Sequence, residues 1–462
     1  MADRTDWPDV ETKPVPEMRA SRLLKVRAVW LAPVIVASLL IVLMTVIYIG
    51  SVVDPSAQLH GLPVLVVNED AGATVHSQRT DIGRQVVSAL RGSTAVSSRL
   101  SLDSMTLPQA RKQLDRNAAY AAIVIPTDFT ASVLGPYAAA PATGRGFSTP
   151  TIRLLTNVRS GSVGVSLATS IAQPALVAIS NEVGARALAR AGGSIPASAT
   201  AFRGGPIAVT AMPFRPLPSR SALGLSAFYI SLLTLLCGFL GAVLVNSSID
   251  AALGYASNEV GTKWQLRAPV PITRWQTLLA KWIMAVCLVP ILTGLLLIVA
   301  IAILNMNASH VAILWLFTSL AAIVVAGGVL VLFAALGSLG QVVAMLVFIY
   351  LALASSGGTI PLQALPGVLR FAAHFEPLRQ ILDGVRAILY FNAAGDAGLT
   401  RGLMMTCVGL VFWLGTGIAI TLWYDRKGMY RMQPELLAYI NASFRAHAEE
   451  SDQASRTSDT LP

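Results

Sequence analysis

The sequence predicts an α-helical membrane protein with six transmembrane helices and a large extracytoplasmic mixed α/β domain between helices one and two. Hydrophobic residues make up 54% of the 462 residues, charged residues only 13%, and the mean hydropathy is +0.63. These values lie on the membrane side of the averages for globular proteins. Residues 29–49 are almost wholly apolar, whereas residues 51–222 have the composition of a soluble domain, and further apolar stretches follow only after it.

The first transmembrane helix is predicted over residues 29–50. Its apolar stretch suits a membrane span better than the short core of a signal peptide, and no small-residue cleavage site follows it. Residues 1–28 are polar and interrupted by prolines, so we expect a disordered cytoplasmic tail. This tail ends in a basic cluster made of Arg19, Arg22, Lys25 and Arg27. Because such clusters prefer the cytoplasmic side, the chain should leave the cytoplasm through the first helix.

Residues 51–222 are predicted to form the extracytoplasmic α/β domain. Strand-like runs of branched and apolar residues occupy residues 62–68, 99–102, 121–125 and 151–156. Helical spacing of apolar residues marks residues 81–90, 107–119 and 162–188. The alternation of strands and helices is typical of mixed α/β domains. Segments rich in Gly, Pro and Ala are expected to form a loop and a linker, at residues 136–150 and 192–220.

A five-helix transmembrane region is predicted over residues 223–424. Its apolar stretches are residues 226–245, 283–304, 311–332, 342–354 and 404–423. Residues 247–281 are expected to form a cytoplasmic loop, because tryptophan and basic residues there are typical of a membrane interface. Residues 358–402 carry several arginines, which are costly inside a membrane, so outer interfacial helices are expected. Residues 425–462 are expected to form a second cytoplasmic tail.

The sequence offers no pattern of catalytic residues. A phosphate-binding loop, an HExxH motif and a GxSxG motif are all missing. The three cysteines lie singly in apolar segments, where small packing residues are expected. We interpret the Asn68-Glu69-Asp70 sequence after the first strand as a structural turn rather than a cation site. We therefore expect a protein that is not an enzyme, with no cofactor and no metal.

The net charge of +10 does not indicate nucleic-acid binding, because the basic residues are scattered and no basic stripe contains interleaved aromatics. Four basic residues of the cytoplasmic loop form a candidate coupling site: Lys263, Arg267, Arg274 and Lys281. They are expected to contact a cytosolic ATPase or anionic lipid, and simple anchoring at the cytoplasmic face is the alternative. Ionisable residues near the spans lie at their ends, which argues against a self-contained proton antiporter.

Several short motifs occur in a fixed order along the chain. They are YIGS at 48–51, LPVLVVNEDAG at 62–72, YAAIVIP at 120–126, RAPVP at 267–271, AKW at 280–282, GGTIP at 357–361, LP at 365–366 and GVR at 384–386. In their order and in the six-span layout, they resemble the permeases of the ABC type-2 transporter class. More narrowly, they resemble the YhgE/Pip branch and the related nitrosoguanidine-resistance domain family.

This resemblance implies an export permease that moves a hydrophobic or amphiphilic substrate, such as a drug or a lipid, out of the cytoplasm. It also implies a homodimer with a separate cytosolic ATPase subunit. The protein is expected in the inner (plasma) membrane, with many passes and with both termini in the cytoplasm. The alternative hypothesis is a non-transporting surface protein anchored in the membrane. Such a protein would act through its extracytoplasmic domain, as a secretion accessory or a phage receptor does.

Overall fold

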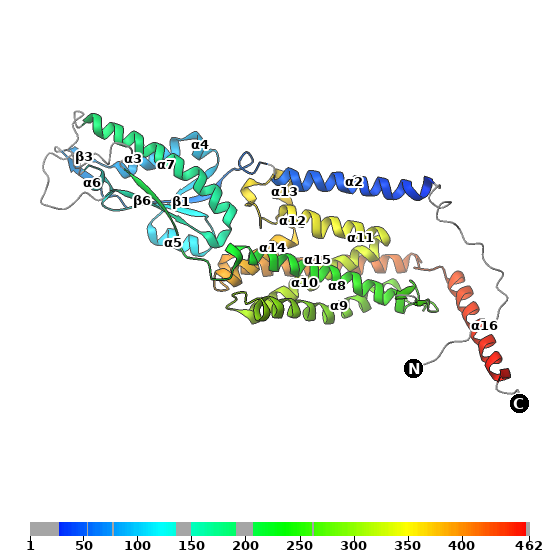
Figure 1. Ribbon diagram of the computed structural model, residues 1–462. Coiled ribbons are helices and arrows are strands. Elements are labelled where there is room, and N and C mark those ends of the chain that lie inside the picture. The colour runs from blue at the N-terminus through cyan, green and yellow to red at the C-terminus, as the bar shows by residue number, and fades with distance from the viewer. Residues whose placement is uncertain are drawn as a thin grey trace.

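The structure is a computed structural model, and it describes residues 27–52, 54–75, 78–134, 149–190, 207–260 and 263–458. The predicted N-terminal tail lies outside these residues, except for its last two positions. Most of the predicted loop at 136–150 also lies outside them. The described chain has two parts, which are a helical bundle and a mixed β-sheet covered by helices (Figure 1).

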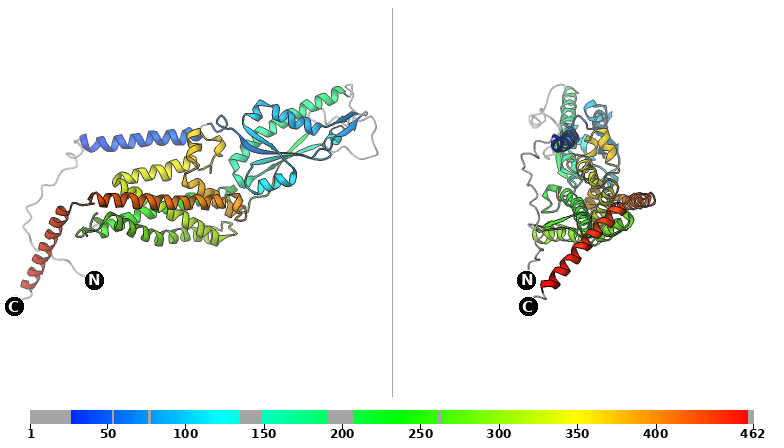
Figure 2. Two further views of the ribbon diagram at one scale, coloured as in Figure 1. Left: turned by 180° about the vertical axis from the view of Figure 1, so that it is seen from behind. Right: turned by 90° about the vertical axis from the view of Figure 1, so that its right-hand side faces the viewer.

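The bundle is built from long apolar helices that run alongside one another (Figure 1). They are α2 (Arg27–Val52), α8 (Ser226–Ala252), α9 (Arg274–Leu297), α10 (Val311–Leu336), α11 (Ser338–Met345) and α15 (Leu399–Arg426). Two of them continue through π-helical segments: α9 into η5 (Ile298–Ile303), and α11 into η6 (Leu346–Leu351) and then α12 (Ala352–Ser355). Figure 2 shows that the sheet lies at one end of an elongated molecule, while α16 (Pro434–Ser458) leans away from the other.

Six helices of the described chain are long and apolar enough to cross a membrane, as in a multi-pass membrane protein. They are Ser162–Arg186, Ser226–Ala252, Arg274–Ile303, Val311–Leu336, Ser338–Ser355 and Leu399–Arg426. The last five correspond to the predicted spans two to six. The first is most of α7 (Ser162–Arg190), which the sequence placed in the α/β domain. The predicted first span, α2, contributes the shorter apolar stretch Ala37–Gly50.

The mixed sheet has the strand order β4-β1-β5-β6-β7. Its strands are β1 (Leu62–Asn68), β4 (Leu100–Ser104), β5 (Ala121–Ile125), β6 (Thr151–Thr156) and β7 (Ala208–Pro213). β1 is parallel to both β4 and β5, β5 is antiparallel to β6, and β6 is parallel to β7. β7 corrects the sequence prediction, which assigned residues 192–220 to a linker. Its Ala- and Pro-containing sequence is a weak strand signal, and it becomes a strand because β6 offers a free edge.

Alternate residues of β1 face opposite sides of the sheet, as the period of a strand requires. Leu62 and Val64 pack with α7 and α3 (Ile82–Gly92), whereas Leu65 and Val67 pack with α5 (Leu107–Asp115). Shorter elements complete this part: α4 (Thr94–Ser97), α6 (Phe129–Leu134), β2 (Ala73–Val75) and β3 (Gln78–Thr80). The sheet therefore lies between two layers of helices, and the side chains of α7 form part of its core.

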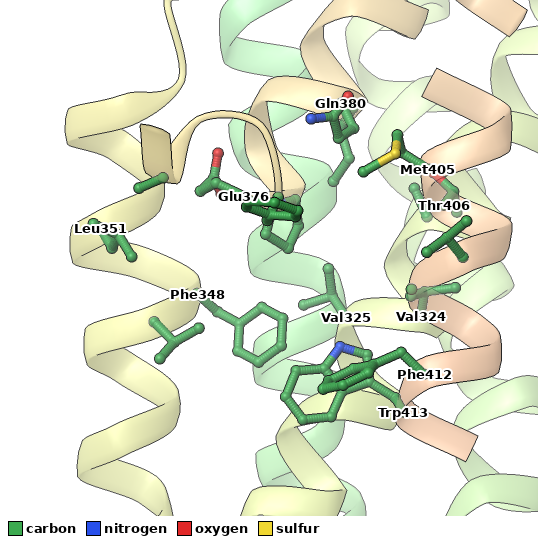
Figure 3. Close-up of a pocket in the computed structure, with 18 residues that line it drawn as sticks. Val324, Val325, Phe348, Leu351, Glu376, Gln380, Met405, Thr406, Phe412 and Trp413 are labelled. Atoms are coloured by element: carbon green, nitrogen blue, oxygen red, sulfur yellow. The ribbon is translucent and has the colours of Figure 1, made fainter. Parts of the chain in front are cut away.

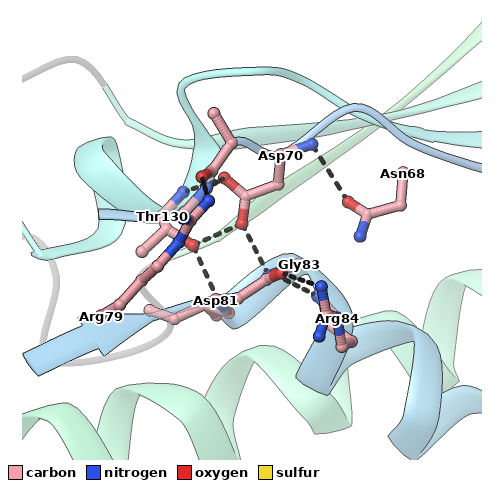
Figure 4. Close-up of polar contacts among 10 residues, drawn as sticks. Asn68, Asp70, Arg79, Asp81, Gly83, Arg84 and Thr130 are labelled. Atoms are coloured by element: carbon pink, nitrogen blue, oxygen red, sulfur yellow. Dashed lines mark hydrogen bonds and ion pairs between the residues drawn. The ribbon is translucent and has the colours of Figure 1, made fainter. Parts of the chain in front are cut away.

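The acidic turn after β1 forms hydrogen bonds to two other segments of this domain (Figure 4). Asp70 Oδ2 accepts a hydrogen bond from the Gly83 amide at 2.9 Å, and Asp70 Oδ1 accepts one from the Thr130 amide at 3.0 Å. The Thr130 hydroxyl also donates to Asp70. One carboxylate thus joins the end of β1 to the starts of α3 and α6. Within the described ranges, no group of three or more His, Cys, Asp or Glu residues could hold a metal ion.

The segment predicted as outer interfacial helices, residues 358–402, contains α13 (Gly367–Ala372) and α14 (Pro377–Tyr390). Most of α14 is buried, because it packs against α8, α10 and α15 rather than lying on a surface. The Tyr390 hydroxyl at its end hydrogen-bonds the Ser226 hydroxyl at 2.7 Å. The Arg159 guanidinium, on the short 3-10 helix η2 (Val158–Ser160), donates to the Tyr390 carbonyl at 2.9 Å. These contacts place α14 at the joint between the bundle and the sheet.

Candidate functional site

An apolar cavity of about 500 Å³ lies between α10, η6, α14 and α15. Figure 3 shows Glu376 and Gln380 at one end of it, and Phe348, Phe412 and Trp413 at the other. The remaining lining residues are Ala321, Val324, Val325, Val347, Leu351, Ala372, Phe375, Pro377, Ile381, Met405, Thr406, Val408 and Gly409. The lining therefore contains one acidic side chain and no basic one.

The aromatic end of the cavity depends on a close approach between helices. Gly328 on α10 faces Phe348 and Trp413, and a Cβ atom at Gly328 would lie 2.7 Å from each of their rings. Only a residue without a side chain fits there. The rings of Phe348 and Trp413 lie 5.7 Å apart, a spacing at which aromatic pairs attract. The wall at this end is thus fixed by packing.

Glu376 is the N-cap residue of α14. Its Oε1 accepts from the Leu378 amide at 2.6 Å, and its Oε2 accepts from the Arg379 amide at 2.9 Å. These bonds satisfy amide groups that the first helical turn leaves without partners. Glu376 is only 4% exposed. Burial raises its pKa to about 7, against the opposing effect of the two amide bonds and of Arg379. The carboxyl group therefore changes charge near neutral pH.

Gln380 lies one turn further along α14 and is 3% exposed. Its Nε2 donates to the carbonyls of His374 at 3.0 Å and Ala373 at 3.3 Å. Its Oε1, in contrast, is buried with no hydrogen-bond partner within the described chain. The polar end of the cavity consequently presents acceptor atoms, which suit a molecule with a hydrophobic body and a donor or positive group at one end.

The cavity is reached from the side of the bundle. Three residues of its lining have large exposed fractions: Phe375 is 67% exposed, Phe412 57% and Val408 54%. Apolar side chains with this exposure on a helical bundle are typical of a surface that faces lipid or another protein. A molecule dissolved in the lipid could therefore enter the cavity without first crossing water.

The candidate coupling residues lie in the connection from α8 to α9 and in the first turns of α9. The ends of α8 and α9 that this connection joins lie at the end of the bundle far from the sheet (Figure 1). Lys281 and Arg274 line one polar cavity of about 420 Å³, together with Asp250 and Arg431. Lys281 Nζ lies 2.7 Å from Asp250 Oδ1 and donates to Asn246 Oδ1 at 2.7 Å. The Arg431 guanidinium binds both oxygens of Asp250, each at 2.5 Å. The structure thus brings two of the four predicted residues together.

The four candidate coupling residues differ in their contacts and in their exposure to solvent. Arg274 Nε donates to the Met429 carbonyl at 2.7 Å, and the Arg274 amide donates to Asp425 Oδ1 at 3.0 Å. Arg274 therefore attaches the start of α9 to the end of α15 and to the segment that follows it. Arg267 is exposed and lies in the connection that follows β9 (Lys263–Gln265), the partner of β8 (Asn258–Val260). Lys263 is the first residue of β9, and the structure describes only its backbone.

Glu376 and Gln380 are not among the residues predicted from the sequence. Neither lies inside a long apolar stretch, and Glu376 precedes a short helix in a proline-rich segment. A local signal was nevertheless present, because an acidic residue followed by Pro377 is a typical helix start. What no local pattern shows is that this helix start lies within the bundle, beside Phe348 and Trp413.

Comparison with known proteins places the chain in a family. Residues 33–413 match the family described as "Protein of unknown function (DUF3533)". No curated protein matches the chain. Among solved structures, it is similar to "a domain of a putative ABC type-2 transporter from Thermotoga maritima MSB8", at 14% identity and a TM-score of 0.24. That similarity covers 33% of this chain and 85% of the other. These matches do not confirm the narrower YhgE/Pip prediction, but the first spans most of the sequence, and the chain belongs to the DUF3533 family.

Proposed function

We propose that the protein is an export permease of the ABC type-2 kind, which moves a hydrophobic or amphiphilic molecule out of the cytoplasm. The observation that carries this proposal is the apolar cavity with Glu376 at one end. Its volume of about 500 Å³ falls within the range of small-molecule sites. The lateral opening favours a substrate that reaches the site from the lipid, and the carboxylate favours one that carries a positive charge.

The proposed topology uses α2, and not α7, as the first of six spans. The apolar side chains of α7, such as Ala172 and Leu176, are buried against the sheet. The apolar side chains of α2 are left exposed instead, with Leu39 66% exposed and Val46 66%. Such a helix is stable in lipid and not in water. The α/β domain, which follows span one and precedes span two, would then lie on the extracytoplasmic side of the inner membrane. Both termini would lie in the cytoplasm.

Energy for export would come from a separate cytosolic ATPase, because the sequence has no phosphate-binding loop. The protein itself is proposed to be no enzyme and to work as a homodimer. Arg267 is the candidate residue for contact with the ATPase, since it is exposed on the proposed cytoplasmic loop. Arg274 and Lys281 would support this loop by holding α9 in place, rather than by touching the partner.

Growth of cells in the presence of toxic amphiphiles tests the function. Cells that produce the protein should tolerate one or more positively charged amphiphiles several-fold better than cells without it. Glu376→Gln should remove this tolerance for charged compounds while the amount of protein in the membrane stays the same. Equal tolerance with and without the protein across neutral and cationic amphiphiles would contradict the proposal, and would favour the alternative of a surface protein.

A further inference from the structure

A second cavity, of about 510 Å³, lies at the joint between the α/β domain and the bundle. Tyr120 and Ser160 line it from the α/β domain, and α14 and the start of α15 line it from the bundle. Its charged lining residues are Arg116, Arg379, Arg386, Arg401, Asp383 and Asp396. With four arginines and two aspartates, this joint cavity has a net formal charge of +2.

Two of the four arginines are paired with the two acids. Arg116 Nε lies 2.6 Å from Asp396 Oδ2, and Arg379 Nε lies 3.5 Å from Asp383 Oδ2. Throughout the described ranges, neither Arg386 nor Arg401 forms an ion pair with an acid. The excess positive charge of the joint cavity therefore belongs to these two residues, which come from α14 and α15.

Arg386 is the deeper of the two and is only 7% exposed. Its guanidinium reaches across to the α/β domain, since a Cβ atom at Gly161 would lie 3.6 Å from its terminal nitrogen. Its Nε is buried and has no hydrogen-bond partner within the described chain. A buried cation without a partner is strongly unfavourable unless an anion compensates it. The position of Arg386 thus indicates that a negative group belongs in this cavity.

Two neutral groups of the lining also lack partners. The Ser160 hydroxyl is buried on a residue that is 5% exposed, and it has no hydrogen-bond partner among the described residues. Gln363 also lines the cavity, and its Oε1 atom is buried with no hydrogen-bond partner among the described residues. A serine hydroxyl can donate to an anionic oxygen, whereas a glutamine oxygen can only accept, for example from an alcohol. Together these groups match a ligand that carries both an anion and a hydroxyl.

We propose that the joint cavity binds a phosphate ester that carries a free hydroxyl group. Arg386 and Arg401 would hold the phosphate oxygens, because the planar guanidinium matches them with paired hydrogen bonds. Ser160 would donate to the phosphate, and Gln363 would accept from the hydroxyl. A ligand held in this way touches both the α/β domain and the bundle, and so it fixes their joint. The source of this ester is either a phospholipid headgroup or a soluble molecule.

Thermal unfolding of the full-length protein in detergent tests the proposal with two probes. One probe is glycerol 3-phosphate, and the other is phosphatidylglycerol added to the detergent micelles. At least one of them should raise the midpoint of unfolding in a saturable way, and the arm that responds identifies the source. Arg386→Gln should weaken the apparent affinity for that probe by about tenfold or more, as expected when a charged hydrogen bond is lost.

The matched control is Arg84→Gln, which removes the charge of an arginine whose side chain is 83% exposed on α3, outside the joint cavity. It should leave the affinity unchanged. If Arg386→Gln does not fold, Arg401→Gln and Ser160→Ala replace it, and each should weaken binding. The proposal is overturned if neither probe stabilises the wild-type protein, or if the variants of the joint cavity bind as tightly as Arg84→Gln. Because the readout is binding, it does not depend on whether the protein transports anything.

Discussion

Lys281 on α9 and Asp250 on α8 form an ion pair in which 2.7 Å separates Nζ from Oδ1, and neither side chain is more than 9% exposed. Arg431, in the segment after α15, binds the same carboxylate. One acidic residue therefore joins three parts of the chain at the end of the bundle opposite the sheet. Lys281, which the sequence predicts as a contact for a partner, is buried at this junction in the structure.

Asp250→Ala should lower the free energy of unfolding by about 3–5 kcal/mol, because it leaves Lys281 buried without its partner. Titration with a denaturing detergent measures this loss. The matched control is Asp115→Ala, which breaks the exposed pair between Asp115 and Arg215, whose side chains are 41% and 53% exposed. That change should cost less than about 1 kcal/mol. Similar losses in the free energy of unfolding for both variants would contradict the prediction, because they would show that water reaches the Asp250 ion pair.

Gly83→Ala should destabilise the α/β domain. A Cβ atom at Gly83 would lie 2.6 Å from Asn68 Oδ1 and 2.6 Å from Asp70 Cβ, which is closer than atoms pack. The new methyl group would push Asp70 away from the amides of Gly83 and Thr130, from which its carboxylate accepts hydrogen bonds. We expect a loss of about 1–3 kcal/mol, measured by unfolding of the full-length protein.

The control for this change lies in the same helix. A Cβ atom at Gly92 would have no atom within 4 Å. Gly92→Ala should therefore be neutral or slightly stabilising, since alanine favours a helix more than glycine does. If the two variants unfold alike, Asp70 does not act as the connection that Figure 4 shows.

Glu376 should make stability depend on pH in a defined window. Its folded pKa of about 7 lies above the ordinary value of 4.5, so the folded state binds the proton more tightly than the unfolded state. Stability from this group is therefore complete below pH 4.5 and is lost as the pH rises to about 7. The total is roughly 3 kcal/mol. Glu376→Gln should remove this part of the pH dependence, and an unchanged slope would contradict the assignment.

The sequence is informative wherever the signal is local. The predicted strands at 62–68, 121–125 and 151–156 match β1, β5 and β6, because runs of branched residues bounded by turns define their own ends. β7 was missed because its pairing with β6 is tertiary. The apolar cavity was missed for the same reason, since Glu376 and Trp413 meet only after α14 packs into the bundle. The length of an apolar stretch alone also does not distinguish a transmembrane helix from a helix such as α7, which packs on a sheet.

Arg267→Glu should reduce export several-fold while leaving the stability of the protein unchanged, because Arg267 is exposed and the proposed ATPase would lose its contact. Arg274→Glu should instead lower stability. It would remove the hydrogen bond to the Met429 carbonyl and would add a carboxylate close to Asp425. Transport and thermal unfolding of both variants separate these effects. Full transport by Arg267→Glu would argue against coupling through this loop.

The most direct measurement concerns the apolar cavity itself. Gly409 lines it, and a Cβ atom there would lie 3.3 Å from one neighbour, a methyl group of Val324, so Gly409→Leu should fill the cavity after a small shift of that side chain. Gly415→Leu is the control, because Gly415 lies on the same helix, outside the lining, and a Cβ there would have no atom within 4 Å. The assay is the accumulation of the most strongly tolerated amphiphile in cells with equal amounts of each protein. We predict that wild-type protein and Gly415→Leu lower accumulation, while Gly409→Leu leaves it as high as in cells without the protein. Accumulation as low with Gly409→Leu as with wild-type protein would contradict the account.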